Sequence, residues 1–137
     1  MSAKPKVQPD DLDLAFYEAT AKAGTLCLQH CRDCGTWTHP ARYYCPSCFS
    51  ENFSFDPVSG RAEIHSYTVS HFSVESAWKD LVPYTSIVAE TAEGPRLVAR
   101  TALPRDQIAI GKPIRLRAEI IDPEFSYVWA ESPGEAA

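Results

Sequence analysis

The sequence has no apolar run that approaches the ~18 unbroken residues required by a membrane-spanning helix. Its first residues, Met-Ser-Ala-Lys-Pro-Lys, also lack the apolar stretch of a secretory signal. We therefore expect a cytoplasmic protein with no membrane partner. Because thiols stay reduced in the cytoplasm, metal binding is a better explanation of its cysteines than disulfide formation.

Positive charge is scarce as well. The chain carries 13 lysines and arginines against 18 aspartates and glutamates, which gives a formal net charge of -5. Domains that grip phosphate backbones usually carry basic stripes and a high isoelectric point, whereas the value here is about 5.3. This balance argues against a nucleic-acid partner.

Recognisable catalytic motifs are missing. The sequence has no G-x-S-x-G, no P-loop and no dinucleotide fingerprint, and no pair of carboxylates is spaced for general acid and base roles. It also has no internal repeat. At 137 residues and 45% hydrophobic, the chain can bury one core beside a small metal-braced unit. We expect a folded domain without an independent active site.

Four of the five cysteines form two C-x-x-C pairs, Cys31 with Cys34 and Cys45 with Cys48. Two such turns side by side place four thiolates around one ion, with Zn–S bonds of ~2.3 Å. Four sulfur ligands leave no open position for water, so a zinc ion held there is structural. A redox dithiol and an iron-sulfur site are the alternatives, but redox work usually needs only one C-x-x-C. The spacing predicts a zinc ribbon with one structural zinc.

Three more reactive side chains lie near these pairs: Cys27, His30 and His39. We interpret the histidines as hydrogen-bonded or solvated neighbours, with a ligand role in a rearranged site as the alternative. Cys27 is interpreted as a spare thiol. A nucleophile-base pair of Cys27 and His30 would make the chain a stand-alone enzyme, although no third orienting group is evident.

Residues 9–24 are predicted to form an amphipathic helix, capped by Asp10 or Asp11 and ended by Gly24. Its apolar residues recur on one face, which packs either on the chain's own core or on a partner. They are Leu12, Phe16, Ala19 and Ala23. The polar segments 1–8 and 132–137 have too little apolar content to order themselves, so we expect disordered tails.

The remaining sequence is strand-like. Residues 26–29 predict a short strand in a ribbon that spans 25–57, with a boundary near Val58. Five further strands are expected at 62–71, 85–90, 96–103, 114–120 and 125–130. A turn at Glu93–Pro95 joins two of them, and 104–111 leaves room for one helical turn. This mainly β pattern favours a five-stranded barrel of the OB type over 58–131, with a sandwich as the alternative.

Aromatic side chains gather after the boundary. Strand alternation places His65, Tyr67 and His71 on one face. Phe72, Trp78 and Tyr84 follow in the next segment. The cluster predicts a groove for a planar or acyl ligand, or else it fills the barrel or its mouth. Because OB-folds also bind single-stranded nucleic acids on aromatic platforms, such a binder is a further alternative.

Together these features resemble a family of small proteins in which a rubredoxin-like zinc ribbon precedes an OB-fold and which accompany thiolases and related acyl-CoA enzymes. The resemblance covers nearly the whole chain. The segments that carry it are residues 24–31 followed by Cys34-Gly35, and residues 40–48, 58–60, 82–84, 93–96 and 110–111. It implies a non-catalytic accessory subunit in a hetero-oligomer with a thiolase-like catalytic chain, whose OB-fold helps to hold the CoA ester.

The resemblance also implies ligand contacts. Arg96 matches a family turn and could reach a CoA phosphate, or could be a solvated hairpin residue. Tyr84 could contact the pantetheine arm. The full candidate ligand set is Tyr67, Phe72, Trp78, Tyr84 and Arg96. Residues 70–81 depart from the family pattern, and we expect them to carry substrate or partner specificity.

Overall fold

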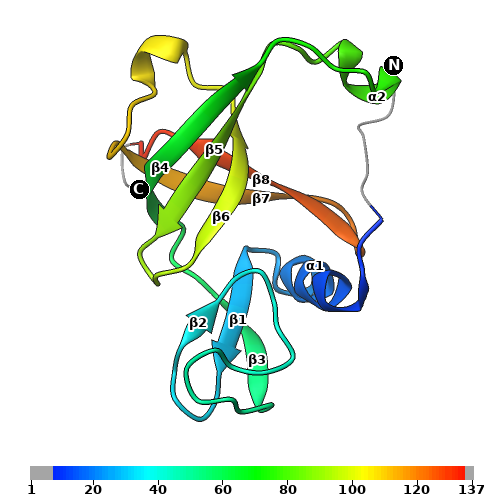
Figure 1. Cartoon of the computed structure of the whole chain (residues 1–137), viewed down its shortest axis with the longest axis vertical. Coiled ribbons are helices and arrows are strands. Elements are labelled where there is room, and N and C mark those ends of the chain that lie inside the picture. Colours follow the sequence, from blue (N-terminus) through cyan, green and yellow to red (C-terminus); the bar gives the residue numbers. More distant parts are fainter. Residues whose placement is uncertain (1–7, 135–137) are drawn as a thin grey trace.

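The computed structural model describes residues 8–134 and arranges them as a small three-stranded sheet, a helix and a five-stranded barrel (Figure 1). The tails predicted to be disordered fall largely on residues 1–7 and 135–137, which lie outside the described residues. Within 8–134, no helix combines the length and the apolar character needed to cross a bilayer.

Helix α1 spans Asp11–Ala23 and confirms the predicted helix. The Asp10 side chain caps it by accepting a 2.9 Å hydrogen bond from the Asp13 N–H, and Gly24 follows its last residue. The helix contacts β1, β3, β7 and β8, so it packs on the chain's own core. Its buried residues are Phe16 and Thr20, whereas Ala23 is exposed. The predicted face was therefore wrong at Ala23, which is the last residue of the helix. It also omitted Thr20, whose buried hydroxyl accepts from the Cys27 N–H at 3.3 Å.

The ribbon is an antiparallel sheet in the order β2-β1-β3. Its strands are β1 (Cys27–Cys31), β2 (Trp37–Thr38) and β3 (Phe53–Pro57). The first matches the predicted strand, shifted toward the first cysteine pair. The other two were not predicted, since β2 is only two residues long and β3 contains an aspartate and a proline.

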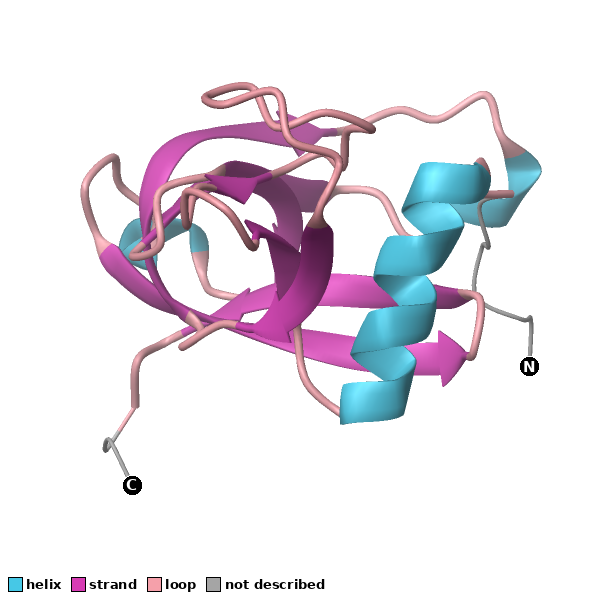
Figure 2. Ribbon diagram, turned by 90° about the horizontal axis from the view of Figure 1, so that it is seen from below, coloured by secondary structure: helices cyan, strands magenta, loops and turns pink. Residues whose placement is uncertain are grey.

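Five strands form the barrel in the order β4-β5-β6-β8-β7, which is the predicted OB-type arrangement and not the sandwich (Figure 2). They are β4 (Arg61–Ser70), β5 (Tyr84–Thr91), β6 (Arg96–Thr101), β7 (Pro113–Asp122) and β8 (Phe125–Glu131). One 3-10 turn, η1 (Arg105–Gln107), fills the predicted gap. The barrel is joined between β6 and β8 by only two parallel residue pairs.

A bulge in β4 changes the predicted face of that strand. The pairing with β5 shifts register between Ile64 and Ser66, so His65 is the extra residue. Tyr67 packs against the core while His65 is exposed, and His71 is exposed beyond the end of the strand. The prediction that His65, Tyr67 and His71 share one face is therefore wrong.

The ribbon and the barrel are joined by a tightly held linker. Gly60 has φ +84, and a Cβ there would lie 3.0 Å from the Leu116 carbonyl oxygen, so glycine permits the close approach. Its own carbonyl accepts from the Leu116 N–H at 2.7 Å. The Glu93 side chain accepts from the Ser59 N–H at 2.9 Å.

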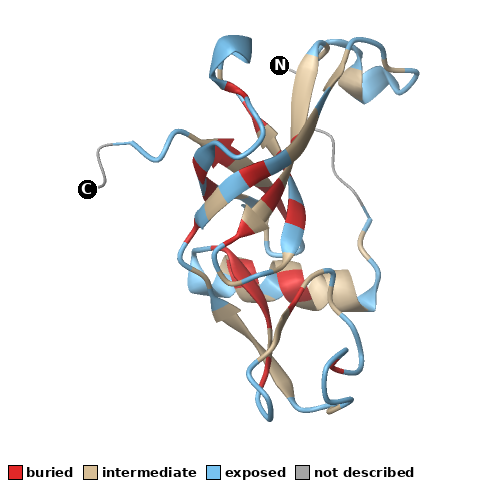
Figure 3. Cartoon of the chain, turned by 60° about the vertical axis from the view of Figure 1, so that its left-hand side comes forward, coloured by how far each residue is buried: buried red, intermediate tan, exposed pale blue. Residues whose placement is uncertain are grey.

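The hydrophobic core extends from the barrel strands to residues of β1 and α1 (Figure 3). The short helix α2 (Ser76–Lys79), in contrast, has no buried residue.

Candidate functional site: a four-cysteine centre and an aromatic barrel face

Two turns of matching geometry carry the cysteine pairs. In the first, the Gly35 N–H donates to the Cys31 carbonyl at 3.1 Å, and Gly35 has φ +80. In the second, the Phe49 N–H donates to the Cys45 carbonyl at 2.8 Å, and Phe49 has φ +63. Both turns thus direct two sulfurs toward the same point, one turn following β1 and the other preceding β3.

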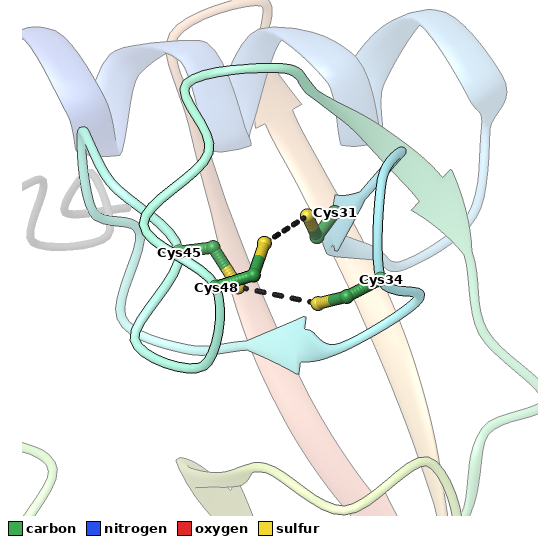
Figure 4. A group of neighbouring side chains, drawn as sticks. All are labelled: Cys31, Cys34, Cys45 and Cys48. Carbon is green, nitrogen blue, oxygen red and sulfur yellow. Dashed lines mark hydrogen bonds between the residues drawn. The ribbon is translucent and has the colours of Figure 1, made fainter.

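The four sulfurs converge (Figure 4). Cys31 Sγ lies 3.6 Å from Cys48 Sγ, Cys34 Sγ lies 3.5 Å from Cys45 Sγ, and all four are within 4.8 Å of one another. A tetrahedral zinc with Zn–S bonds of 2.3 Å requires sulfurs about 3.8 Å apart. The donor set therefore fits a four-sulfur zinc centre, with no position left for water or substrate.

The electrostatics of the centre also suit a cation. Backbone hydrogen bonding from Cys48 lowers the pKa of Cys45 to about 6, although burial acts against it. For Cys48, backbone hydrogen bonding from Ser50 lowers the pKa, but burial and the neighbouring sulfurs outweigh it and raise the pKa to about 12. Crowded thiolates hinder one another's ionisation. A divalent cation among them would let all four ionise together.

The two histidines near the centre are neighbours, as the sequence predicts. His30 Nδ1 lies 2.8 Å from Asp56 Oδ2, and the imidazole stacks on Trp37 with ring centres 3.9 Å apart. His39 packs on the Phe16 ring at 5.2 Å, and burial lowers its pKa. Among the residues 8–134, the metal-binding group contains the four cysteines and neither histidine.

Cys27 has the environment of a structural thiol. Its side chain is 1% exposed, and Sγ lies 3.5 Å from the Thr25 carbonyl oxygen. Burial raises its pKa, and the charge of Asp56 raises it further. Because a nucleophilic cysteine must be ionised and reachable, this geometry gives no support to a stand-alone enzyme built on Cys27.

A second cluster lies on the outer face of the barrel, around Arg100. Its guanidinium carbon is 5.0 Å from the Trp78 ring and 5.4 Å from the Tyr84 ring, and those two rings are 5.3 Å apart. Tyr127 and Trp129 complete the group at 5.6 and 4.9 Å. Sequence reasoning found Trp78 and Tyr84 but missed the other three. Their only local signal is strand alternation, which places Tyr127 and Trp129 on one side of β8.

The other predicted ligand residues lie elsewhere. The Tyr67 hydroxyl accepts from Arg105 Nη2 at 2.8 Å, and that guanidinium also covers the Tyr67 ring. Phe72 is 78% exposed. Arg96 pairs with Glu90 at 3.0 Å and lines a groove beside α1. The structure thus brings together Trp78 and Tyr84 from the predicted set, whereas Tyr67 and Arg96 have other partners and Phe72 is exposed to solvent.

Fold and site define a small two-part protein in which a four-cysteine ribbon precedes an OB-type barrel. Residues 20–54 match the family model described as the ChsH2 rubredoxin-like zinc ribbon domain, and residues 56–119 match the one described as the ChsH2 C-terminal OB-fold domain. The chain belongs to this ChsH2 family of zinc-ribbon and OB-fold proteins. The family resemblance inferred from the sequence is therefore confirmed.

Three similar proteins give this family context. A chain of the solved structure named "Ltp2-ChsH2(DUF35) aldolase" is 31% identical, with a TM-score of 0.75 and coverage of 94% of this chain and 98% of that one. A probable enoyl-CoA hydratase alpha subunit from Thermomonospora curvata is 34% identical over 83% of this chain. The benzoylsuccinyl-CoA thiolase subunit BbsA from Thauera aromatica is 30% identical over 71% of this chain and 68% of its own length. This chain spans only 35% of the hydratase subunit.

Proposed function

We propose that this chain is a non-catalytic accessory subunit of a thiolase-superfamily acyl-CoA enzyme, in a cytoplasmic hetero-oligomer. One observation carries the proposal: 94% of this chain corresponds to 98% of a chain from an assembly whose name joins two components, Ltp2 and ChsH2. The thiolase subunit BbsA supports the same role by its name. One of these names contains the word aldolase, and the other names a subunit of a thiolase.

The chemistry of the described residues agrees with an accessory role. The four-cysteine centre has no open ligand position, so one zinc held by Cys31, Cys34, Cys45 and Cys48 would brace the ribbon without activating a substrate. Cys27 is buried, and its pKa is raised. Such a chain offers rigid surface and leaves nucleophile, acid and base to the catalytic subunit.

The CoA ester belongs to the same proposal. Trp78 and Tyr84 lie together on the outer face of the barrel, where an extended ligand could run beside them. Arg96 is half-exposed, and its ion pair with Glu90 is open to solvent, so it could exchange that partner for a CoA phosphate. Tyr67 and Phe72 remain candidate contacts of the ester or of the partner.

Ion pairs among the described residues weigh against the nucleic-acid alternative. Arg96 pairs with Glu90, Arg117 with Glu131, and Arg32 lies 3.6 Å from Asp56. These ion pairs interrupt the positive charge that a phosphate backbone would need.

Co-purification tests the proposal. The tagged chain is expressed with a thiolase-like chain from the same genome, and size-exclusion chromatography with light scattering measures the complex. We expect the two chains to elute together in a fixed ratio. A thiolase-like chain that elutes alone, and is fully active alone, would contradict the proposal.

A further inference from the structure

A groove of about 510 Å³ lies on the outer face of the barrel, where β7 and β8 meet the segment that follows β6. Ala102, Leu103 and Pro104 form one side of its lining. Arg117, Glu119, Trp129 and Glu131 also line it. This volume lies within the range of small-molecule sites. None of the cysteines of the metal centre contributes to it.

Trp129 is held in place by Glu119, which also lines the groove, and by Arg100, which does not. Its Nε1–H donates a 2.7 Å hydrogen bond to Glu119 Oε1. The Arg100 guanidinium lies 4.9 Å from its ring centre, and Arg100 is not part of the lining. Since the indole is fixed before any ligand arrives, stacking on it costs little side-chain entropy.

The charges in the groove select against an anion. Among residues 8–134, Arg117 is the only cation that lines the groove, and its Nε lies 3.0 Å from Glu131 Oε2. Glu119 supplies a second carboxylate. With two carboxylates beside one guanidinium, the net charge at the groove is negative and disfavours a phosphate or carboxylate, even though the ion pair itself is exposed. The polar edge of a neutral ring could instead hydrogen-bond to the Arg117–Glu131 pair.

We propose that this groove binds a neutral planar ring, which stacks on Trp129 and turns its polar edge toward Arg117 and Glu131. Leu103 and Pro104 provide the apolar wall around the ring. The two sources considered for this ring depend on the proposed function as a subunit of an acyl-CoA enzyme. One is the adenine base of CoA, and the other is an aromatic ring in the acyl group.

The test uses the full zinc-loaded chain without any partner. Adenosine and benzamide are titrated separately by calorimetry and by saturation-transfer NMR, with CoA as a third probe. We expect at least one of the two rings to bind, and Trp129→Leu to weaken it about tenfold or more, as loss of a stacking platform does. Ala102→Phe is a second variant that fills the groove from an exposed position. Tyr44→Leu, at an exposed tyrosine of the ribbon, is the control and should bind as the wild type does.

The probes distinguish the sources. Adenosine and CoA binding without benzamide assigns the groove to the base, and benzamide binding alone assigns it to the acyl ring. If neither ring binds, or if both groove variants bind as the wild type does, the proposal is overturned. That result would leave co-purification with the catalytic subunit untouched, so the failure of this site and the failure of the proposed function are separate outcomes.

Discussion

Gly35 and Phe49 occupy equivalent positions, each directly after the second cysteine of its pair, and both adopt positive φ angles. Glycine takes this left-handed conformation without strain, whereas other residues pay roughly 1–2 kcal/mol. Phe49 is 77% exposed, so burial of its ring does not offset that cost. The second turn therefore holds Phe49 in a left-handed backbone conformation that its residue type disfavours.

Exchanging residue types at these two positions should change stability in opposite directions. We expect Phe49→Gly to raise the free energy of unfolding by about 1 kcal/mol, because it removes left-handed strain. Gly35→Ala should lower it by about 1 kcal/mol, although a Cβ there would meet no atom within 4 Å. Guanidinium unfolding at saturating zinc measures both. Changes of the same sign would contradict the interpretation.

At the scale of the elements, helix α1 and the ribbon are in contact through His39. His39 follows β2 and packs on Phe16 of α1, and burial lowers its pKa. The facing charge is Asp13, which acts in the opposite direction. A histidine whose folded-state pKa is depressed stabilises the fold above its unfolded pKa of about 6.5, and this stabilisation is lost as the pH falls.

The contact between α1 and the ribbon should therefore weaken in mild acid. From about pH 7.5 to 5.5 the unfolded chain takes up a proton that folded His39 resists, so the unfolding free energy should fall by up to about 1.4 kcal/mol per pH unit. His39→Phe keeps a ring against Phe16 without a titrating group. Denaturant midpoints across this range measure the difference. Parallel curves for wild type and variant would rule out His39 as the cause.

The segment between β4 and β5 depends on Arg100 for its position. Trp78 lies in α2 within this segment, Tyr84 is the first residue of β5, and both contact that guanidinium. Each exposed cation–π contact contributes about 0.5–1 kcal/mol. Arg100→Gln should therefore speed amide exchange in residues 71–83 about fivefold, as measured by mass spectrometry. Arg105→Gln, which removes a similar contact from Tyr67, is the control. Equal effects of the two variants on 71–83 would count against this anchoring.

Local patterns predicted the elements better than the sites. Asp10 and Gly24 mark the two ends of α1, and the alternating residues from Ile114 to Ile120 lie in β7. Both elements could be predicted because these signals depend only on residues close together in the sequence. The bulge at His65 was missed, since it arises from pairing with β5 more than 20 residues away. The three further members of the Arg100 cluster were missed for the same reason: the cluster joins residues of α2, β5, β6 and β8.

At the scale of the whole molecule, the ribbon and the barrel are joined by packing contacts and hydrogen bonds. α1 contacts both, the Val58 N–H donates to the Leu26 carbonyl at 3.1 Å, and Glu93 holds the Ser59 N–H. Binding of zinc to a four-cysteine centre contributes on the order of 10 kcal/mol to folding. The metal should therefore order the N-terminal half and, through it, the surface available to a partner.

Loss of one ligand tests this dependence. We expect Cys34→Ser to bind less than one zinc per chain and to lose dispersed amide NMR signals from the ribbon, because an incomplete centre cannot hold the two turns together. Cys27→Ser is the matched control and should keep its zinc, as Cys27 lies outside the centre. The zinc content per chain and the amide NMR spectra of the two variants measure these effects. Full occupancy in Cys34→Ser would refute the zinc assignment.

The accessory role is tested most directly by measuring thioester turnover for three samples: the chain alone, the thiolase-like chain alone, and their reconstituted complex. The account predicts no turnover by the isolated chain and full activity only when the two are combined. Turnover at an enzymatic rate by this chain alone would contradict it.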